Sequence, residues 1–328
     1  MRVLVTGGTG FTGSALVLHL LQEGYDVLAI DVKEGLRSDE LRSAGAEVRL
    51  GTITDAGFIA QCMRGVGVVH HLAAAFRQPG APDAHYYDVN VSGTRILLEA
   101  ALRNDVGKFV HCSTCGVHGH VEDPPADEDA PIAPADYYQK TKYLGELVAL
   151  KYVDRGLETV ILRPAALYGP GDPGRFFMLY RYAQRGFFPM FGKGDVLYHP
   201  VYLENYLEAS LSAMEPGRGV GRVYLVADEE CPTLEGLVRE VADVLGVDMR
   251  IRYFPLRPLI IAGHVTEKLT KPFGFAPPIF PRRVDWFRQT RAFDIGRAKR
   301  ELGYEPRYTL REGLERTVEW YRSSGWLS

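Results

Sequence analysis

The chain has 328 residues, of which 46% are hydrophobic and 24% charged, and its formal net charge is −3. These values are ordinary for a folded enzyme and argue against a disordered chain and against the basic excess that nucleic acid or an anionic membrane would select. A strand pattern begins at residue 2, and the apolar stretch at residues 258–263 is far shorter than the roughly 20 residues of a membrane span, so we expect neither an export leader nor a transmembrane segment. Four cysteines without an export signal indicate reduced thiols and a cytoplasmic protein.

Apolar runs of strand length alternate with helical stretches through the first half of the chain. They are RVLVT at 2–6, DVLAI at 26–30, EVRL at 47–50, GVVHHLA at 67–73, KFVHC at 108–112 and TVILR at 159–163. This alternation predicts βαβ units, and the continuously apolar runs predict a parallel sheet covered by helices on both faces. We expect an α/β fold with a doubly wound sheet in residues 1–165, to which the chain returns around 196–226, and a smaller, mixed substrate lobe mainly in residues 166–328.

A glycine-rich turn follows the first strand. The stretch TGGTGFTG, Thr6 to Gly13, lies between that strand and the helical pattern ALVLHLLQEG, which is the context of a dinucleotide-binding turn in a Rossmann domain. Gly7 permits the tight turn, Gly10 lets the backbone approach a pyrophosphate, and Gly13 allows close packing of helix on sheet. The alternative is a glycine-rich turn that binds nothing. The candidate phosphate-binding residues are Gly7, Gly10, Phe11, Thr12 and Gly13.

Asp31 ends the second strand, where a carboxylate would accept hydrogen bonds from the adenosine ribose and would repel a 2′-phosphate. We therefore expect NAD rather than NADP. Lys33 and Arg37 lie near enough to accommodate the additional phosphate, so NADP stays an alternative. A solvated carboxylate without a ligand is the structural alternative for Asp31.

Tyr138 and Lys142, in DYYQKTKYLGE, stand four residues apart in a helical pattern, so their side chains rise from one face. A lysine ammonium near a phenol favours the phenolate and lowers the tyrosine pKa from about 10 toward the working range of a general acid or base. Tyr138 could then move the proton of an alcohol. Amphipathic helices also place such pairs on solvated faces by chance.

The ordered set of motifs resembles the extended short-chain dehydrogenase/reductase family, which includes nucleotide-sugar epimerases and 3β-hydroxysteroid dehydrogenases. The resemblance covers nearly the whole chain. Besides the glycine turn and the tyrosine–lysine pair, the matching motifs are HLAA at 71–74, NVSGT at 90–94, STCGVHG at 113–119, LRPAALYGPG at 162–171 and FDIGRAKRELGYEP at 293–306.

The resemblance implies hydride exchange between a nicotinamide and a carbinol or carbonyl carbon. In the family, a hydroxyl residue at the end of a strand orients the substrate oxygen, and here that residue is Thr114. Tyr138 would transfer the proton, while Lys142 would bind the nicotinamide ribose and tune Tyr138. Thr52 and Ile53 stand where the family commonly has an aspartate and a hydrophobic residue near the adenine. The remaining cofactor contacts implied by similarity are Leu72, Ala73, Ala74, Asn90 and Pro164.

The segment HCSTCGVHGH, residues 111–120, combines CxxC spacing with histidines, which raises the question of a metal site or a redox disulfide. Zinc usually takes four ligands, yet the sequence has no second CxxC, and His118 and His120 lack the usual spacing. A redox pair is expected at the start of a helix rather than at the end of the fifth strand. We therefore expect no metal, with the cysteines bracketing Ser113 and Thr114. His118 stands at the family's tyrosine position.

Two departures from the family pattern bear on the substrate. Nucleotide-sugar members hold a diphosphate with an asparagine and an arginine, but here Ala166 occupies the first position, and Tyr198 and His199 occupy the second. The cations left as substitutes are Arg175, Arg181, Arg185, Lys193 and Arg282. The second lobe is instead rich in aromatic and apolar residues, at 176–191 and 253–286, as in sterol and 3β-hydroxysteroid dehydrogenases. The alternative is that these aromatics form ordinary core or an interface.

The sequence thus predicts an NAD-dependent dehydrogenase for a secondary alcohol or ketone on a small molecule with a large apolar body. The second hypothesis is an NAD-dependent nucleotide-sugar 4-epimerase or dehydratase, which reverses or diverts the same hydride step. A third is a non-catalytic dinucleotide sensor, against which the intact Thr114, Tyr138 and Lys142 argue. The resemblance also implies a homodimer formed through helices at 94–104 and 138–153, and we expect no nucleic-acid partner.

Overall fold

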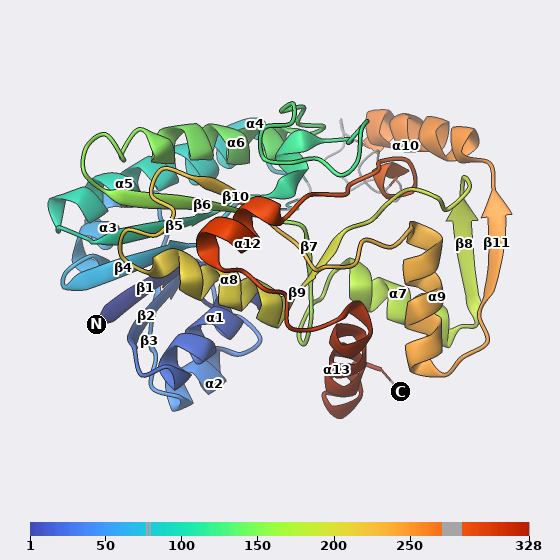
Figure 1. Cartoon of the computed structure of the whole chain (residues 1–328), viewed down its shortest axis with the longest axis horizontal. Coiled ribbons are helices and arrows are strands. Elements are labelled where there is room, and N and C mark those ends of the chain that lie inside the picture. Colours follow the sequence, from blue (N-terminus) through green and yellow to red (C-terminus); the bar gives the residue numbers. More distant parts are fainter. Residues whose placement is uncertain (77, 79, 271–283, 328) are drawn as a thin grey trace.

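The larger lobe contains a seven-stranded parallel sheet (Figure 1). The structure is a computed structural model that describes residues 1–76, 78, 80–270 and 284–327. The strands lie in the order β10-β6-β5-β4-β1-β2-β3, with every neighbouring pair parallel. From β1 the chain adds β2 and β3 on one side, and then continues with β4 on the other side of β1. Open α/β sheets bind ligands at the carboxyl ends of the two strands, here β1 and β4, between which the order reverses in this way. The strands are β1 (Arg2–Thr6), β2 (Asp26–Asp31), β3 (Glu47–Leu50), β4 (Val66–His71), β5 (Lys108–Cys112), β6 (Glu158–Pro164) and β10 (Val223–Val226).

Helices cover both faces of this sheet, which explains why most of its strands are largely apolar, whereas the edge strand β3 is only partly buried. On one face lie α1 (Phe11–Gln22), α2 (Ser38–Ser43), α8 (Leu203–Met214) and α12 (Gly296–Leu302). On the other lie α3 (Ala56–Cys62), α5 (Thr94–Arg103) and α6 (Tyr137–Leu150). The short helix α4 (Asp83–Tyr87) continues through a π-helical turn, residues 88–93, into α5. The expected doubly wound sheet is confirmed.

The second lobe is smaller and mixed, and the chain enters it directly after β6 (Figure 1). It contains two parallel strand pairs, β7 (Ala166–Tyr168) with β9 (Pro200–Tyr202), and β8 (Phe187–Phe191) with β11 (Arg250–Phe254). Between β9 and β11 the chain returns to the larger lobe, where α8 packs on the sheet and β10 forms its edge strand. The helices of the second lobe are α7 (Arg175–Gln184), α9 (Leu234–Leu245), α10 (Leu256–Thr270) and α13 (Leu310–Ser323), with a 3₁₀ turn at Asp285–Phe287.

Most of the aromatic residues of the second lobe form its own core. Tyr180, Phe188 and Tyr321 are almost fully buried, and Trp286 packs edge-on against Phe188 with ring centroids 6.1 Å apart. For the aromatic segment 176–191, the alternative that these residues form ordinary core is therefore largely correct, because only Phe176 of that segment lines the cavity described below. Residues 271–283 of the second aromatic stretch, including Arg282, lie outside the described residues.

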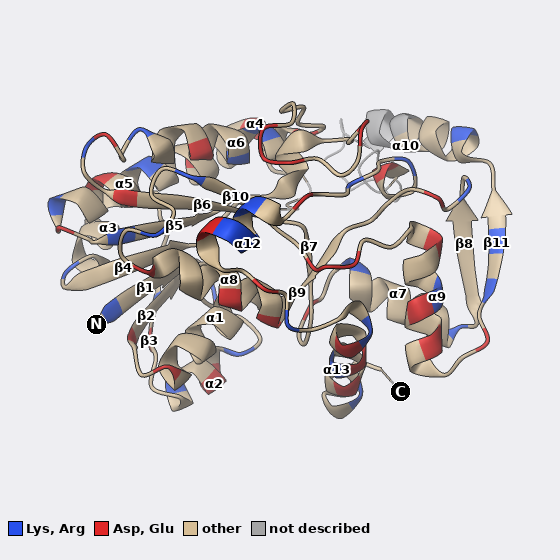
Figure 2. Cartoon of the chain, viewed as in Figure 1, with Lys and Arg blue, Asp and Glu red and all other residues tan. Residues whose placement is uncertain are grey.

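Acidic and basic residues both lie on the helices of the two lobes (Figure 2). Among the helices that the structure describes, none combines the length and apolar character needed to cross a membrane.

Candidate active site

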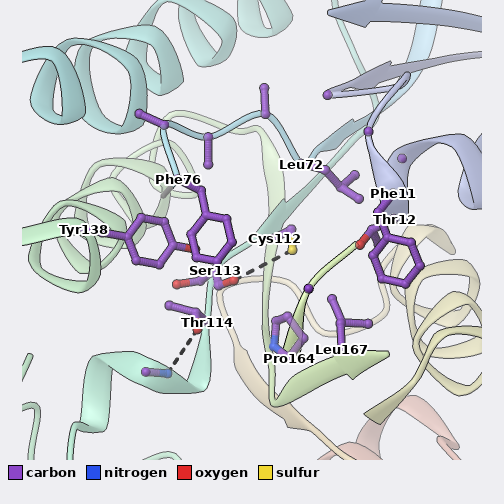
Figure 3. A pocket seen from close by; sticks show the side chains of 18 of the residues that line it. Phe11, Thr12, Leu72, Phe76, Cys112, Ser113, Thr114, Tyr138, Pro164 and Leu167 are labelled. Carbon is purple, nitrogen blue, oxygen red and sulfur yellow. Dashed lines mark hydrogen bonds between the residues drawn. The ribbon is translucent and has the colours of Figure 1, made fainter. Parts of the chain in front are cut away.

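A single cavity of about 750 Å³ follows the carboxyl ends of β1, β2, β4 and β5 and continues into the second lobe. Its lining joins the glycine turn to the hydroxyls of Thr114 and Tyr138 (Figure 3). Two expected site residues, Asn90 and Lys142, do not line it and lie behind its wall. The expected residues that do line it are Gly7, Gly10, Phe11, Thr12, Gly13, Asp31, Thr52, Ile53, Leu72, Ala73, Ala74, Thr114, Tyr138 and Pro164.

The glycine turn connects β1 to α1 in a conformation that larger residues would disrupt. Gly7 has a φ of +70°, and a Cβ there would lie 2.8 Å from the amide nitrogen of Ala73. A Cβ on Gly13 would lie 2.0 Å from the carbonyl oxygen of Gly7. Gly10 caps α1 without a side chain, so no side-chain acceptor at the cap occupies the first amide N–H groups of the helix. These groups at the positive end of the helix dipole are suited to bind an anion such as a pyrophosphate.

Asp31 lies beside this turn, where β2 ends. Its carboxylate accepts hydrogen bonds from the backbone N–H of Val32 at 2.7 Å and of Thr9 at 3.3 Å. The Thr9 hydroxyl in turn donates to the carbonyl of Lys33 at 2.8 Å. Arg37 is bound to Glu40 by two hydrogen bonds of 2.7 and 2.8 Å. The carboxylate is therefore fixed at the cavity wall, whereas the nearby guanidinium is already paired.

Buried hydrogen bonds hold the opposite wall, residues 72–75, in place. The hydroxyl of Thr6 is 2.7 Å from Nδ1 of His71 and accepts from the N–H of Ala73 at 3.1 Å. Asn90 accepts from the N–H of Ala75 at 2.8 Å and donates to the hydroxyl of Thr141 on α6 at 3.0 Å. Asn90 thus ties this wall to α6 from behind.

Thr114 and Tyr138 approach the cavity from two different elements. Thr114 follows β5 and caps the 3₁₀ turn at Cys115–His118, where its Oγ1 accepts a hydrogen bond from the N–H of Gly116 at 3.1 Å. The helix α6 begins at Tyr137 because Asp136 caps it, accepting from the N–H of Gln139 at 2.8 Å, and this places Tyr138 in its first turn. Figure 3 shows Tyr138 beside Phe76, with their ring centroids 4.9 Å apart, and Thr114 below them.

Lys142 lies one helical turn after Tyr138, with its side chain only 2% exposed. Burial lowers the pKa of its ammonium, while Cys112 and Glu146 act against that shift. Its charge also contributes to keeping His111 neutral, because burial and then Lys142 lower the pKa of that imidazole. The ammonium of Lys142 is therefore buried and interacts electrostatically with Cys112, which lines the cavity.

A buried ion pair between Arg163 and Glu146 lies beside Ser113, the residue before Thr114, and was not expected from the sequence. Nε and Nη2 of Arg163 donate to the carboxylate of Glu146, the latter at 2.7 Å, and the hydroxyl of Ser113 donates to the same carboxylate. Nη1 of Arg163 donates to Nε2 of His118 at 3.0 Å, while Nδ1 of His118 donates to the carbonyl of Pro131 at 3.2 Å. The sequence feature that could have revealed this ion pair is the arginine in the apolar strand run TVILR, since a buried charge needs a partner of opposite charge.

The cysteines of the CxxC motif are free thiols. Burial raises the pKa of Cys112 and raises that of Cys115 to about 11, which is opposite to the shift of a reactive thiolate. Among the residues that the structure describes, no three histidine, cysteine, aspartate or glutamate side chains are grouped so as to hold a metal ion.

The half of the cavity in the second lobe combines apolar residues with one acidic residue, Asp172, and two arginines. Arg175 is the one cation among the expected substitutes that lines it in the described chain, since Arg181, Arg185 and Lys193 do not. Arg291 also lines it and was missed, because nothing in its local sequence marks it. The other residues of this half are Ala166, Leu167, Asp172, Pro173, Gly174, Phe176, Tyr198 and His199.

Known proteins with a similar sequence or structure include dehydrogenases and sugar-nucleotide enzymes. A 3 beta-hydroxysteroid dehydrogenase/Delta 5-->4-isomerase of Mycobacterium tuberculosis is 31% identical over 344 residues, covering 98% of this chain and 90% of the relative. A 2-alkyl-3-oxoalkanoate reductase of Stenotrophomonas maltophilia is 28% identical, covering 96% and 98%. The crystal structure of DesIV, a dTDP-glucose 4,6-dehydratase from Streptomyces venezuelae with NAD and TYD bound, has a TM-score of 0.80 and 28% identity, covering 100% and 99%.

Residues 3–227 match the model of the NAD dependent epimerase/dehydratase family. The family resemblance inferred from the motifs is confirmed, and so is NAD as the expected cofactor. The chain belongs to the NAD dependent epimerase/dehydratase family.

Proposed function

We propose that this protein is an NAD-dependent oxidoreductase that transfers hydride between the nicotinamide and a secondary alcohol or ketone carbon of a substrate with a large apolar body. The observation that supports this most strongly is the continuity of the cavity. The same space reaches from the glycine turn, past Thr114 and Tyr138, to the apolar residues of the second lobe.

The residues of the first half fit a dinucleotide. The uncapped start of α1 would receive the pyrophosphate, and the close packing at Gly7 and Gly13 brings the backbone to it. Asp31 would accept hydrogen bonds from the ribose, and the pairing of Arg37 with Glu40 favours NAD over NADP at this position.

The residues at the centre fit proton transfer. When bound, NAD supplies the hydride acceptor for the oxidation of an alcohol carbon. Tyr138 would take the proton from the alcohol oxygen, or return it in the reverse direction. Thr114 Oγ1 accepts from Gly116, which leaves its own proton to donate to that same substrate oxygen. Lys142, buried one helical turn after Tyr138, would favour the ionised form of Tyr138.

The outer half fits an apolar substrate body. Ala166, Leu167 and Phe176 offer carbon surface, and Tyr198 packs its ring against Phe176 with centroids 6.3 Å apart. Two of the relatives described above are named for 3β-hydroxysteroids and 2-alkyl-3-oxoalkanoates, which carry an alcohol or a ketone on an apolar skeleton.

The second candidate function is a nucleotide-sugar 4-epimerase or dehydratase, which the similarity to DesIV favours. Against it stands the wall beside β9. Ala166 offers no polar group to a diphosphate, and both ring nitrogens of His199 are engaged, with Nε2 donating to the carbonyl of Asp228 at 2.8 Å and Nδ1 accepting from the N–H of Phe293 at 3.2 Å. A purely sensory role is less favoured because Thr114, Tyr138 and Lys142 are all present.

A cofactor assay separates these functions. The purified protein is incubated with NAD and, in separate reactions, with apolar secondary alcohols or with UDP- and dTDP-sugars. We expect NADH to accumulate with an alcohol and not with the sugars. Conversion of a nucleotide sugar without net NADH, together with inactivity on all the alcohols, would contradict the proposal and favour the epimerase or dehydratase.

We also propose a cytoplasmic homodimer. The four free thiols fit a reducing compartment. Leu147, on the outer side of α6, is 39% exposed and fits an interface built from α5 and α6. Size-exclusion chromatography with light scattering should give twice the mass of one chain, and the mass of a single chain would contradict the dimer.

A further inference from the structure

Arg291 occupies a fixed position at the wall of the cavity. Its backbone N–H donates to the carbonyl of Leu197 at 2.9 Å, and its carbonyl accepts from the N–H of His199 at 3.0 Å. On the other side, the N–H of Ala126 donates to the carbonyl of Ala292 at 2.9 Å. Residues 290–292 therefore run like an inserted strand between two segments, and the guanidinium is presented from a rigid backbone.

The charge of Arg291 is not balanced within the described residues. Its Nε–H is buried and has no hydrogen-bond partner among them, and Nη2 donates only to the neutral amide of Gln289. Asp285 interacts with Arg291 electrostatically, but its carboxylate is bound to Arg288 at 2.6 Å. Burial, and then the like charge of Arg175, lower the pKa of Arg291, yet a guanidinium remains protonated in proteins.

Arg163 shows how this fold treats an arginine that serves only the structure. Glu146 accepts two N–H groups of Arg163, and His118 together with the carbonyl of Glu128 accepts from a third. Within the described residues, the chain thus supplies acceptors for every nitrogen of the Arg163 guanidinium but none for the buried Nε–H of Arg291. A buried donor without an acceptor is unfavourable, so a ligand acceptor at Arg291 would relieve that penalty.

Arg175 adds a second positive charge to the same half of the cavity. It begins α7, and its guanidinium lies 5.9 Å from the centre of the Trp286 ring. Arg175 lies close enough to contribute to the lowered pKa of Arg291, of which burial is the main cause. An anion bound between them would be attracted by both and repelled by the carboxylate of Asp172, which also lines this half.

The location favours a small anion near the reacting oxygen. Arg291 acts electrostatically on Cys115, the residue that follows Thr114, so the guanidinium lies near the end of β5. In a nucleotide sugar, the sugar ring separates the diphosphate from the reacting carbon, so the diphosphate would not lie beside the reacting oxygen. The lining near Arg291 also includes the carbon surface of Leu167, Phe176 and Tyr198. A carboxylate matches the forked donor geometry of one guanidinium.

We propose that Arg291, assisted by Arg175, binds a carboxylate of the substrate, so that the substrate is an apolar hydroxy or oxo acid rather than a neutral alcohol. This inference rests on the proposed oxidoreductase function and specifies the substrate class at the same site.

The test compares an acid with its ester. The NAD-loaded protein is titrated with 3-hydroxydodecanoate and with its methyl ester, and kcat/KM is measured for both as NADH forms. We expect the native protein to prefer the acid by about a hundredfold, since the ester removes one partner of a desolvated charge pair. Arg291→Gln should bring the ratio of acid to ester close to one, and Arg175→Gln should lower it less. Arg181→Gln is the matched control, because Arg181 lies on α7 but does not line the cavity, and it should keep the native ratio.

The other outcomes distinguish failure of the carboxylate site from failure of the oxidoreductase function. Equal kcat/KM for acid and ester in the native protein, or an unchanged ratio in Arg291→Gln, would overturn the carboxylate site while leaving the oxidoreductase function standing. Turnover of a nucleotide sugar, with neither acid nor ester bound to the NAD-loaded protein in calorimetry, would overturn both. If Arg291→Gln does not fold, as judged by its Tm and its affinity for NAD, Arg291→Met replaces it, because methionine removes the charge and keeps an extended side chain; a native ratio there would also overturn the site.

Discussion

The two halves of the cavity are constructed differently. The dinucleotide half uses backbone amides and small side chains from short segments that directly follow strands, such as residues 7–13 and 72–74. The substrate half uses large side chains from segments far apart in the sequence, among them Arg175, Tyr198 and Arg291. A short motif can therefore encode the cofactor and the class of reaction, whereas the choice of substrate is encoded only once the chain has folded.

Two arginines next to the cavity, Arg163 and Arg291, also differ in how the fold binds them. Arg163 is bound by Glu146 and His118, while the Nε–H of Arg291 is buried without a hydrogen-bond partner among the described residues. The expected effects of substitution follow this division.

The largest expected effect is on turnover. Tyr138→Phe removes the hydroxyl that moves the proton and should lower kcat by about a thousandfold, while the Kd for NAD stays nearly native. Steady-state assays and calorimetric titration with NAD measure the two quantities. Tyr137→Phe is the matched control, since Tyr137 is the adjacent residue of α6 and does not line the described cavity. Full activity in Tyr138→Phe would reject the assigned role.

The next effect is on folding. Arg163→Met leaves the carboxylate of Glu146 buried without its cation and should reduce the free energy of unfolding by about 3–5 kcal/mol. Chemical denaturation measures this loss. Arg239→Met, which removes an exposed pair with Glu235 at 2.7 Å, should change it by less than about 1 kcal/mol. Similar losses in both variants would remove the distinction between a structural arginine and a surface one.

A pH-dependent effect arises in the sheet beneath the dinucleotide half. Burial lowers the pKa of His70 to about 3, from an ordinary value of 6.5. Below pH 6.5 the unfolded chain therefore binds a proton that the native state does not, and stability falls as the pH decreases toward 3 by about 1.4 kcal/mol per pH unit for this group. His70→Leu should remove that share of the acid sensitivity. Denaturation curves at pH 7 and pH 5 measure it, and an unchanged pH slope in the variant would show that His70 is protonated in the native state.

The smallest of these effects concerns the choice of cofactor. Asp31→Asn removes the negative charge at the ribose position and should decrease the preference for NAD over NADP by about tenfold. Asp26→Asn, at the exposed beginning of the same strand, should leave the preference unchanged. An unaltered preference in Asp31→Asn would place the selection elsewhere in the cavity.

The sequence predicted those parts of the candidate site that a single local motif determines. The glycine turn and Thr114 follow strands of a parallel sheet and Asp31 ends one, so topology alone brings them to one edge. The partner of Arg163 could have been anticipated, because a charge in an apolar strand run needs one. Arg291 could not, since its place depends on backbone pairing with residues 197–199, and the burial of the lobe aromatics depends on packing that composition does not reveal.

The central claim is that the cavity transfers hydride from a substrate carbon to NAD and releases the products. The most direct measurement supplies a secondary alcohol, active in the NADH assay, with deuterium on its carbinol carbon, and examines the cofactor by mass spectrometry. The expected result is free NADH that is heavier by one deuterium, formed by the native protein and not by Tyr138→Phe. Unlabelled cofactor, or deuterium that remains on the substrate carbon while product forms, would contradict hydride transfer at this site.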